Sequence, residues 1–187
     1  MDNKFFTFIK PYLSFIDSGK LYRKPFYWLY VVLAAANLLF PFYVLYEAID
    51  SRMFSMGDAK FIFAFILIWL VMLAAAWVGF QIWWDRKDKV QNTTSEGADF
   101  PATPVISHLI QTIGECVGAW VAIVGFGSSL FTWILLGSGG WYNELPLSGG
   151  FWGIIIFPVV GFLIIVFTRF VAEQIRALAS IANNTKK

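Results

Sequence analysis

The chain has one cysteine, one histidine and few charged side chains, and each scarcity excludes a class of protein. Cys116 alone can form neither a disulfide framework nor a cysteine-ligated metal cluster. A single histidine, His108, cannot supply the two imidazoles of a bis-histidine haem. Serines and carboxylates also lack the partners and spacing that catalysis or metal binding requires. We therefore expect a protein that is not an enzyme and that holds no metal and no cofactor.

Nucleic acid and nucleotides are also unexpected ligands. The formal net charge is only +2, and the basic residues form no patch interleaved with exposed aromatics. The Gly-rich stretch at 137–150 contains no phosphate-binding motif. Its single charged residue is Glu144. The sequence thus predicts neither a nucleic-acid partner nor a nucleotide.

What the chain has in abundance is apolar sequence. Hydrophobic residues make up 58% of its 187 residues and charged residues only 14%, whereas soluble domains carry about 25% charged residues. Four runs approach the roughly 20 apolar residues that cross a bilayer. They are Phe26–Tyr46, Phe61–Trp84, Cys116–Leu136 and Phe151–Thr168. The composition therefore predicts an all-α integral membrane protein with four transmembrane helices, in contact with the lipid bilayer.

The distribution of Lys and Arg predicts the orientation of these spans. Twelve of the 14 lie in the N-terminal segment, the middle loop or the C-terminal segment, and only Arg52 and Lys60 lie in the other loops. Loops rich in Lys and Arg stay in the cytoplasm. We therefore expect both termini in the cytoplasm.

The polar stretch at 91–103 divides the apolar sequence into two parts. We expect a cytoplasmic interfacial segment at 1–25, a first transmembrane hairpin at 26–90, this linker at 91–103, and a second hairpin with helical extensions at 104–187. Within the first segment, Lys10–Asp17 is predicted to form a short helix on the membrane surface, with Pro11 in its first turn.

One polar position interrupts the first span. Asn37 and Pro41 lie four residues apart, and Pro41 has no amide hydrogen to donate to the Asn37 carbonyl. A kink with a free carbonyl is therefore expected near mid-membrane. We interpret Asn37 as a residue that bonds a neighbouring helix, with an intramembrane polar site involving Asn37, Pro41 and His108 as the alternative.

The third and fourth helices carry polar residues at helical spacing. His108, Gln111 and Glu115 form a stripe before the apolar part of the third helix, and Arg169 and Glu173 follow the apolar part of the fourth. Antiparallel packing would place Glu115 at the depth of Arg169. We predict a structural ion pair or helix contact involving Glu115, Arg169 and Glu173. A proton or ion path through Glu115 and His108 remains an alternative.

Small residues predict close contact between the same two helices. Glycines at this spacing allow helix backbones to approach in a membrane. The predicted packing positions are Gly114, Gly118, Gly125, Gly153 and Gly161.

The C-terminal part resembles a known family. The Arg-Phe-Val-Ala-Glu run at 169–173 and the Ile-Ala-Asn-Asn-Thr run at 181–185 resemble the C-terminal signature of a bacterial family of small two-span membrane proteins whose role is unknown. The resemblance covers 104–185 and leaves the first hairpin outside. It implies a bacterial inner-membrane protein.

The sequence favours a non-catalytic function. We expect an accessory or scaffold subunit of a larger membrane assembly, partnered by other membrane subunits or by copies of itself. A small oligomeric channel or transporter is the alternative.

Overall fold

The computed structural model describes residues 4–17, 20–92, 102–137, 145 and 147–185, and the regular structure in these ranges is all helical. It consists of a short helix α1 (Lys4–Asp17), a single-turn helix α3 (Met53–Met56) and four long helices. The long helices are α2 (Lys20–Asp50), α4 (Ala59–Gln91), α5 (Ala102–Leu136) and α6 (Gly150–Thr185). The predicted linker at 91–103 lies outside the described residues except at its two ends.

All four long helices are long and apolar enough to cross a membrane, as the composition predicts. The chain is a multi-pass membrane protein. The helices contain 31, 33, 35 and 36 residues, which correspond to about 46–54 Å at 1.5 Å per residue. The hydrocarbon core of a bilayer is only about 30 Å thick. Each helix is therefore longer than the part of it that would cross the hydrocarbon core, because the helix continues beyond the apolar residues.

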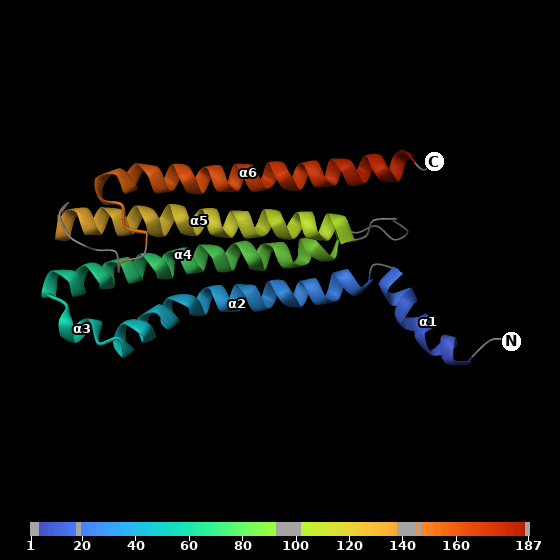
Figure 1. Ribbon diagram of the computed structural model, residues 1–187, viewed down its shortest axis with the longest axis horizontal. Helices are drawn as coiled ribbons and strands as arrows, with labels where there is room; N and C mark the ends of the chain where they lie inside the picture. The colour runs from blue at the N-terminus through green and yellow to red at the C-terminus, as the bar shows by residue number, and fades with distance from the viewer. Residues whose placement is uncertain (1–3, 18–19, 93–101, 138–144, 146, 186–187) are drawn as a thin grey trace.

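The long helices lie side by side in a row in chain order (Figure 1). Helix α2 packs on α4, α4 on α5, and α5 on α6, with the last pair in the most extensive contact. Successive long helices run in opposite directions, so the N-terminus and the C-terminus lie at the same end of the molecule. We call this the terminal end and the other the α3 end.

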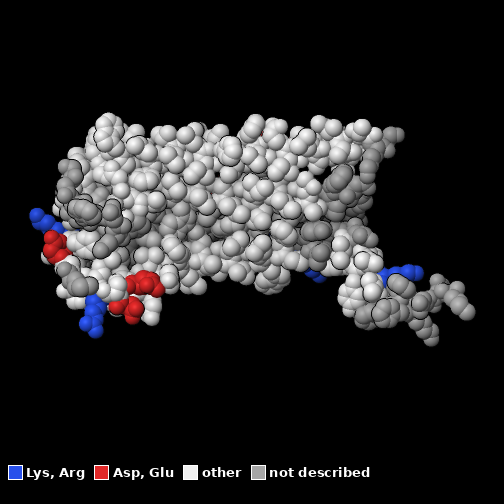
Figure 2. All heavy atoms as spheres, in the orientation of Figure 1, with Lys and Arg blue, Asp and Glu red and all other residues white. Residues whose placement is uncertain are grey.

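The lateral surface visible in Figure 2 is almost free of charge between the two ends. Charged side chains gather at the α3 end, where Figure 2 shows both acidic and basic groups, and at the terminal end. An uncharged band between charged ends is the surface expected of a protein that spans a bilayer.

One local boundary prediction differs from the structure. Helix α1 begins at Lys4 rather than Lys10, so Pro11 lies inside the helix and not in its first turn. The apolar period continues on both sides of Pro11, which favours one longer amphipathic helix despite the lost hydrogen bond. Helix α2 continues through Pro41 as a single helix, and Figure 1 shows this helix bending as it approaches the α3 end.

Candidate functional site

The most polar part of the buried interior is centred on Glu115, in the half of α5 nearer the terminal end. Arg86 of α4 donates from Nη2 to both carboxylate oxygens of Glu115, at 3.0 and 2.9 Å. Arg169 of α6 donates from Nε to Oε1 at 2.9 Å, and its Nη2 lies 2.9 Å from the same oxygen. One carboxylate thereby ties three helices together.

The Glu115 carboxylate is also bound from within its own helix. Gln111, one turn earlier, donates from Nε2 to Oε1 at 2.9 Å. Its own Oε1 accepts a hydrogen bond from Nη2 of Arg176 at 3.0 Å. We refer to Arg86, Gln111, Glu115, Arg169 and Arg176 as the arginine network. It contains three guanidinium groups and one carboxylate and therefore has an excess of positive charge.

Exposure differs sharply within this network. The Glu115 side chain is 9% exposed, the Arg86 side chain 21% and the Arg169 side chain 52%. A buried carboxylate without partners would be strongly unfavourable in a low-dielectric interior. The two arginines and Gln111 remove that penalty. The half-exposed Arg169 also leaves part of the positive charge at the surface.

Glu173 is not part of the network. It lies one turn after Arg169 but is exposed, and no ion pair to it is found among the residues that the structure describes. Periodicity places Glu173 on the same helix face as Arg169. Arg169 bonds Glu115, whereas Glu173 is exposed.

His108 belongs to a second hydrogen-bonded group. The hydroxyl of Tyr30 in α2 lies 2.9 Å from Nδ1 of His108 and 3.3 Å from Oγ1 of Thr112. Thr112 in turn donates to the backbone carbonyl of His108 at 2.8 Å. The Tyr30 ring packs edge-on against Trp83, with 5.0 Å between ring centroids. These contacts join α2, α4 and α5 at the terminal end.

Asn37 bonds two neighbouring helices. Its Nδ2 donates to the carbonyl of Ala76 in α4 at 2.7 Å, and its Oδ1 accepts from Nε1 of Trp120 in α5 at 2.7 Å. The Pro41 carbonyl accepts a hydrogen bond from Nε1 of Trp69 at 2.8 Å. Asn37 and Pro41 therefore both act as helix contacts. His108 bonds Tyr30, so the three residues of the predicted intramembrane polar site are not brought together by the hydrogen bonds that the structure records.

The glycines of α5 and α6 lie at the interface between these helices. A Cβ atom on Gly118 would lie 2.6 Å from the carbonyl oxygen of Gly161. Gly114 faces Thr168, Gly125 faces Phe157 and Gly153 faces Ser129, each too closely for a side chain to fit without movement. The small-residue face is therefore used inside the chain and is covered by α6.

The polar groups do not form a continuous line along the bundle. Toward the α3 end, the next buried polar side chain of α5 after the Asn37–Trp120 contact is Ser128. Seven residues lie between Trp120 and Ser128, which are about 12 Å apart along the helix, and all seven are apolar or glycine. Among the described residues, the Ser128 hydroxyl is the one buried side-chain polar atom without a hydrogen-bond partner.

No candidate metal or catalytic centre emerges from the described residues. They contain no group of three histidine, cysteine or acidic side chains arranged to hold a metal ion. Arg86, Glu115 and Arg169 are bonded to one another in the arginine network. The arrangement is suited to fixing helix positions and to attracting an anion.

Arg86, Arg176 and Tyr30 were missing from the sequence-based predictions. Arg86 lies in a charged run that follows two tryptophans, a pattern typical of a membrane interface. Tyr30 lies among other aromatics in the first span. The position of Arg86 in the sequence could have indicated its role. Arg86 is the first cation after the second apolar run, as Arg169 is the first cation after the fourth.

Comparison with known proteins gives no family assignment. No family model, no curated protein and no solved structure matches this chain.

Proposed function

We propose that this protein is a non-catalytic subunit or scaffold of a membrane assembly, and that the part of α6 beyond the bilayer is its docking element. The supporting observation is exposed apolar side chains outside the apolar span. Leu178 is 66% exposed and Ile181 is 62% exposed, and both follow Arg169.

The length of α6 supports this placement. Its apolar part, 151–168, is about 27 Å long, close to the thickness of the hydrocarbon core. The remaining 17 residues, 169–185, would then extend about 25 Å beyond it. Apolar side chains exposed there would be covered by a protein partner, which is the usual meaning of such surfaces outside a bilayer.

The orientation and location are also part of the proposal. Lys and Arg concentrate in the N-terminal segment, the middle loop and the C-terminal segment, which supports a cytoplasmic location of the terminal end. The resemblance of 104–185 to a bacterial two-span family supports the bacterial inner membrane. The α6 extension would then meet a partner, or a second copy of this chain, at the cytoplasmic surface.

The arginine network supports a structural rather than a catalytic role for the polar residues. Glu115 accepts hydrogen bonds from three side chains on three helices, so its carboxylate is committed to holding the bundle. A channel or transporter, the alternative function, would need a polar path. The apolar stretch of α5 between Trp120 and Ser128 interrupts such a path within one chain.

Substitution on the exposed face tests the docking element. Leu178→Glu combined with Ile181→Glu should dissociate the native particle extracted in mild detergent, as measured by its mass. Gln174→Glu combined with Ser180→Glu adds the same two charges at exposed polar positions of α6 and should leave the particle intact. An unchanged particle with the double variant would contradict the proposal.

Ion flux separates the two candidate functions. In reconstituted vesicles, a subunit or scaffold should give no flux above that of protein-free vesicles. Flux that depends on the Glu115 carboxylate, lost in Glu115→Gln while the particle remains assembled, would instead establish the channel.

A further inference from the structure

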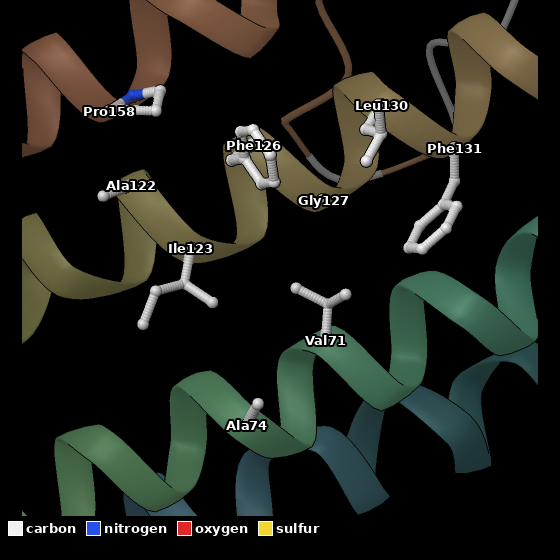
Figure 3. A pocket seen from close by; sticks show the side chains of 9 residues that line it. All are labelled: Val71, Ala74, Ala122, Ile123, Phe126, Gly127, Leu130, Phe131 and Pro158. Atoms are coloured by element: carbon white, nitrogen blue, oxygen red, sulfur yellow. The ribbon is translucent and has the colours of Figure 1, made fainter.

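An apolar groove opens on α5 in the membrane-spanning part of the molecule. It has a volume of about 420 Å³ and lies between α4 and α6. Figure 3 shows its floor on α5, with Ala122, Phe126 and Gly127, and its sides at Val71 and Ala74 of α4 and at Pro158 of α6. Every residue that lines the groove is apolar or glycine.

Small residues make the groove. Ala74, Ala122 and Gly127 leave space where larger side chains would fill the angle between neighbouring helices. Ala74 is exposed although it lies beside a helix contact. A hydrophobic chain is therefore the only kind of occupant that this part of the site favours.

The groove and the arginine network share one face of α5. Glu115, Ala122 and Phe126 follow one another at intervals of seven and four residues, which places them along a single helical stripe. On α6, Pro158 and Arg169 are eleven residues apart, which is again about three full turns. The network therefore lies at the terminal end of the stripe that forms the groove.

The distance along α6 between the groove and the arginine network matches the thickness of one leaflet of a bilayer. Eleven residues of α-helix extend about 16 Å, and half of the hydrocarbon core is about 15 Å thick. Arg169 is the first charged residue after the apolar part of α6. A lipid whose headgroup lies at the depth of Arg169 would thus have its acyl chains at the depth of the groove.

The positive charge of the arginine network indicates which kind of lipid headgroup the site would bind. Arg86 and Arg169 bond the carboxylate of Glu115, and Arg176 bonds Gln111 one turn away, so the network holds three positive charges and one negative charge. The half-exposed Arg169 brings this excess to the surface. Basic sites between transmembrane helices favour anionic lipid headgroups, and guanidinium groups bind phosphate with charge-assisted hydrogen bonds.

We propose that α4, α5 and α6 form a binding site for an anionic phospholipid, with its phosphate at Arg169 and Arg86 and one acyl chain in the groove. This site does not depend on the proposed docking role of the α6 extension, and it could be present in a subunit, a scaffold or a channel.

Lipid retention tests the site directly. The purified full-length protein is titrated with phosphatidylglycerol and, separately, with phosphatidylcholine in detergent, and bound lipid is counted by native mass spectrometry. Phosphatidylglycerol should bind at one site about fivefold or more tightly than phosphatidylcholine, the ratio expected for one added charge contact. Equal binding of the two lipids would overturn the proposal.

A pair of matched variants tests the groove. Ala74→Phe fills it from its exposed rim, and Ala35→Phe adds the same side chain at an exposed position of α2. Ala74→Phe should abolish the one-site binding of phosphatidylglycerol, whereas Ala35→Phe should leave it unchanged. Retention of the site in Ala74→Phe, or equal loss in both variants, would contradict an acyl chain in the groove.

Two substitutions in the arginine network test the site, because they should change the affinity for phosphatidylglycerol in opposite directions. Arg169→Gln removes a positive charge and should weaken phosphatidylglycerol binding about fivefold, while Glu115→Gln removes the negative charge and should strengthen it by a similar factor. A purely structural network would lose binding in both variants. If either variant fails to fold, Ala74→Phe and the comparison of the two lipids with the unaltered protein still decide the question.

A headgroup without chains distinguishes a lipid site from a simple anion site. Glycerol phosphate, added at the same concentrations, should not displace bound phosphatidylglycerol, because it cannot occupy the groove. Displacement by glycerol phosphate would reduce the site to an anion-binding cluster and overturn the lipid proposal.

Discussion

At the scale of single residues, Glu115 is the most connected polar group in the described structure. Its pairing with Arg169 follows from sequence, because helical periodicity and antiparallel packing bring the two residues to one depth. The contact between Arg86 and Glu115 could not be predicted in this way. Nothing in a linear charge run indicates which cation turns inward, since that choice depends on how α4 is rotated against α5.

Replacing Glu115 should destabilise the protein strongly. Glu115→Ala leaves Arg86 and Gln111 without their shared acceptor in a largely buried place, and loss of one partner of a buried ion pair costs about 3–5 kcal/mol. The free energy of unfolding in detergent should fall by about that amount, as measured by denaturant titration of tryptophan fluorescence.

Glu173→Ala is the matched control, since Glu173 is exposed and carries no ion pair among the described residues. Its effect on stability should stay within about 0.5 kcal/mol. Similar losses in the two variants would mean that the network does not hold the bundle.

At the scale of elements, the closest contact is between α5 and α6. Glycine spacing on the two helices predicts that their backbones approach, and the structure places the Gly118 and Gly161 backbones against one another. The boundaries were harder to predict. Helix α1 starts six residues before the expected position, because an amphipathic pattern can outweigh the proline that usually marks a first turn.

A side chain at Gly118 should separate these helices. Its Cβ would meet the backbone of Gly161 at 2.6 Å, and a backbone atom cannot move aside as a flexible side chain can. Gly118→Val should therefore lower the free energy of unfolding by about 1–3 kcal/mol. Thermal unfolding followed by circular dichroism measures the change.

Ala35→Val provides the comparison, because Ala35 is exposed on α2 and has room for added atoms. Its melting temperature should match that of the unaltered protein. A Gly118→Val variant that melts at the same temperature would show that the α5–α6 contact is looser than the structure indicates.

At the scale of the whole molecule, composition was sufficient to predict four membrane-spanning helices, since runs of about 20 apolar residues have few other uses. Composition could not predict the row in which α4 packs on α5. Contacts between apolar helices depend on side-chain shape and not on a pattern of polarity. The row also leaves the groove on α5 open, and no sequence motif predicts this groove.

The orientation of the row is testable by chemical labelling. In a Cys116→Ser background, Ser55→Cys places a thiol at the exposed α3 end, and Ser180→Cys places one at the exposed α6 extension. A membrane-impermeant maleimide should label Ser55→Cys in spheroplasts of an expressing bacterium. Ser180→Cys should react only after lysis. The reverse pattern would place the terminal end outside.

The mass and composition of the native particle test the central claim most directly. The chain is tagged at its C-terminus, extracted in mild detergent, and analysed by native mass spectrometry. The account predicts a particle of fixed stoichiometry, containing partner subunits or further copies of this chain, that disassembles when Leu178 and Ile181 are replaced by glutamate. A lone monomer with bound lipid would contradict a role in assembly and would leave the lipid site as the remaining function.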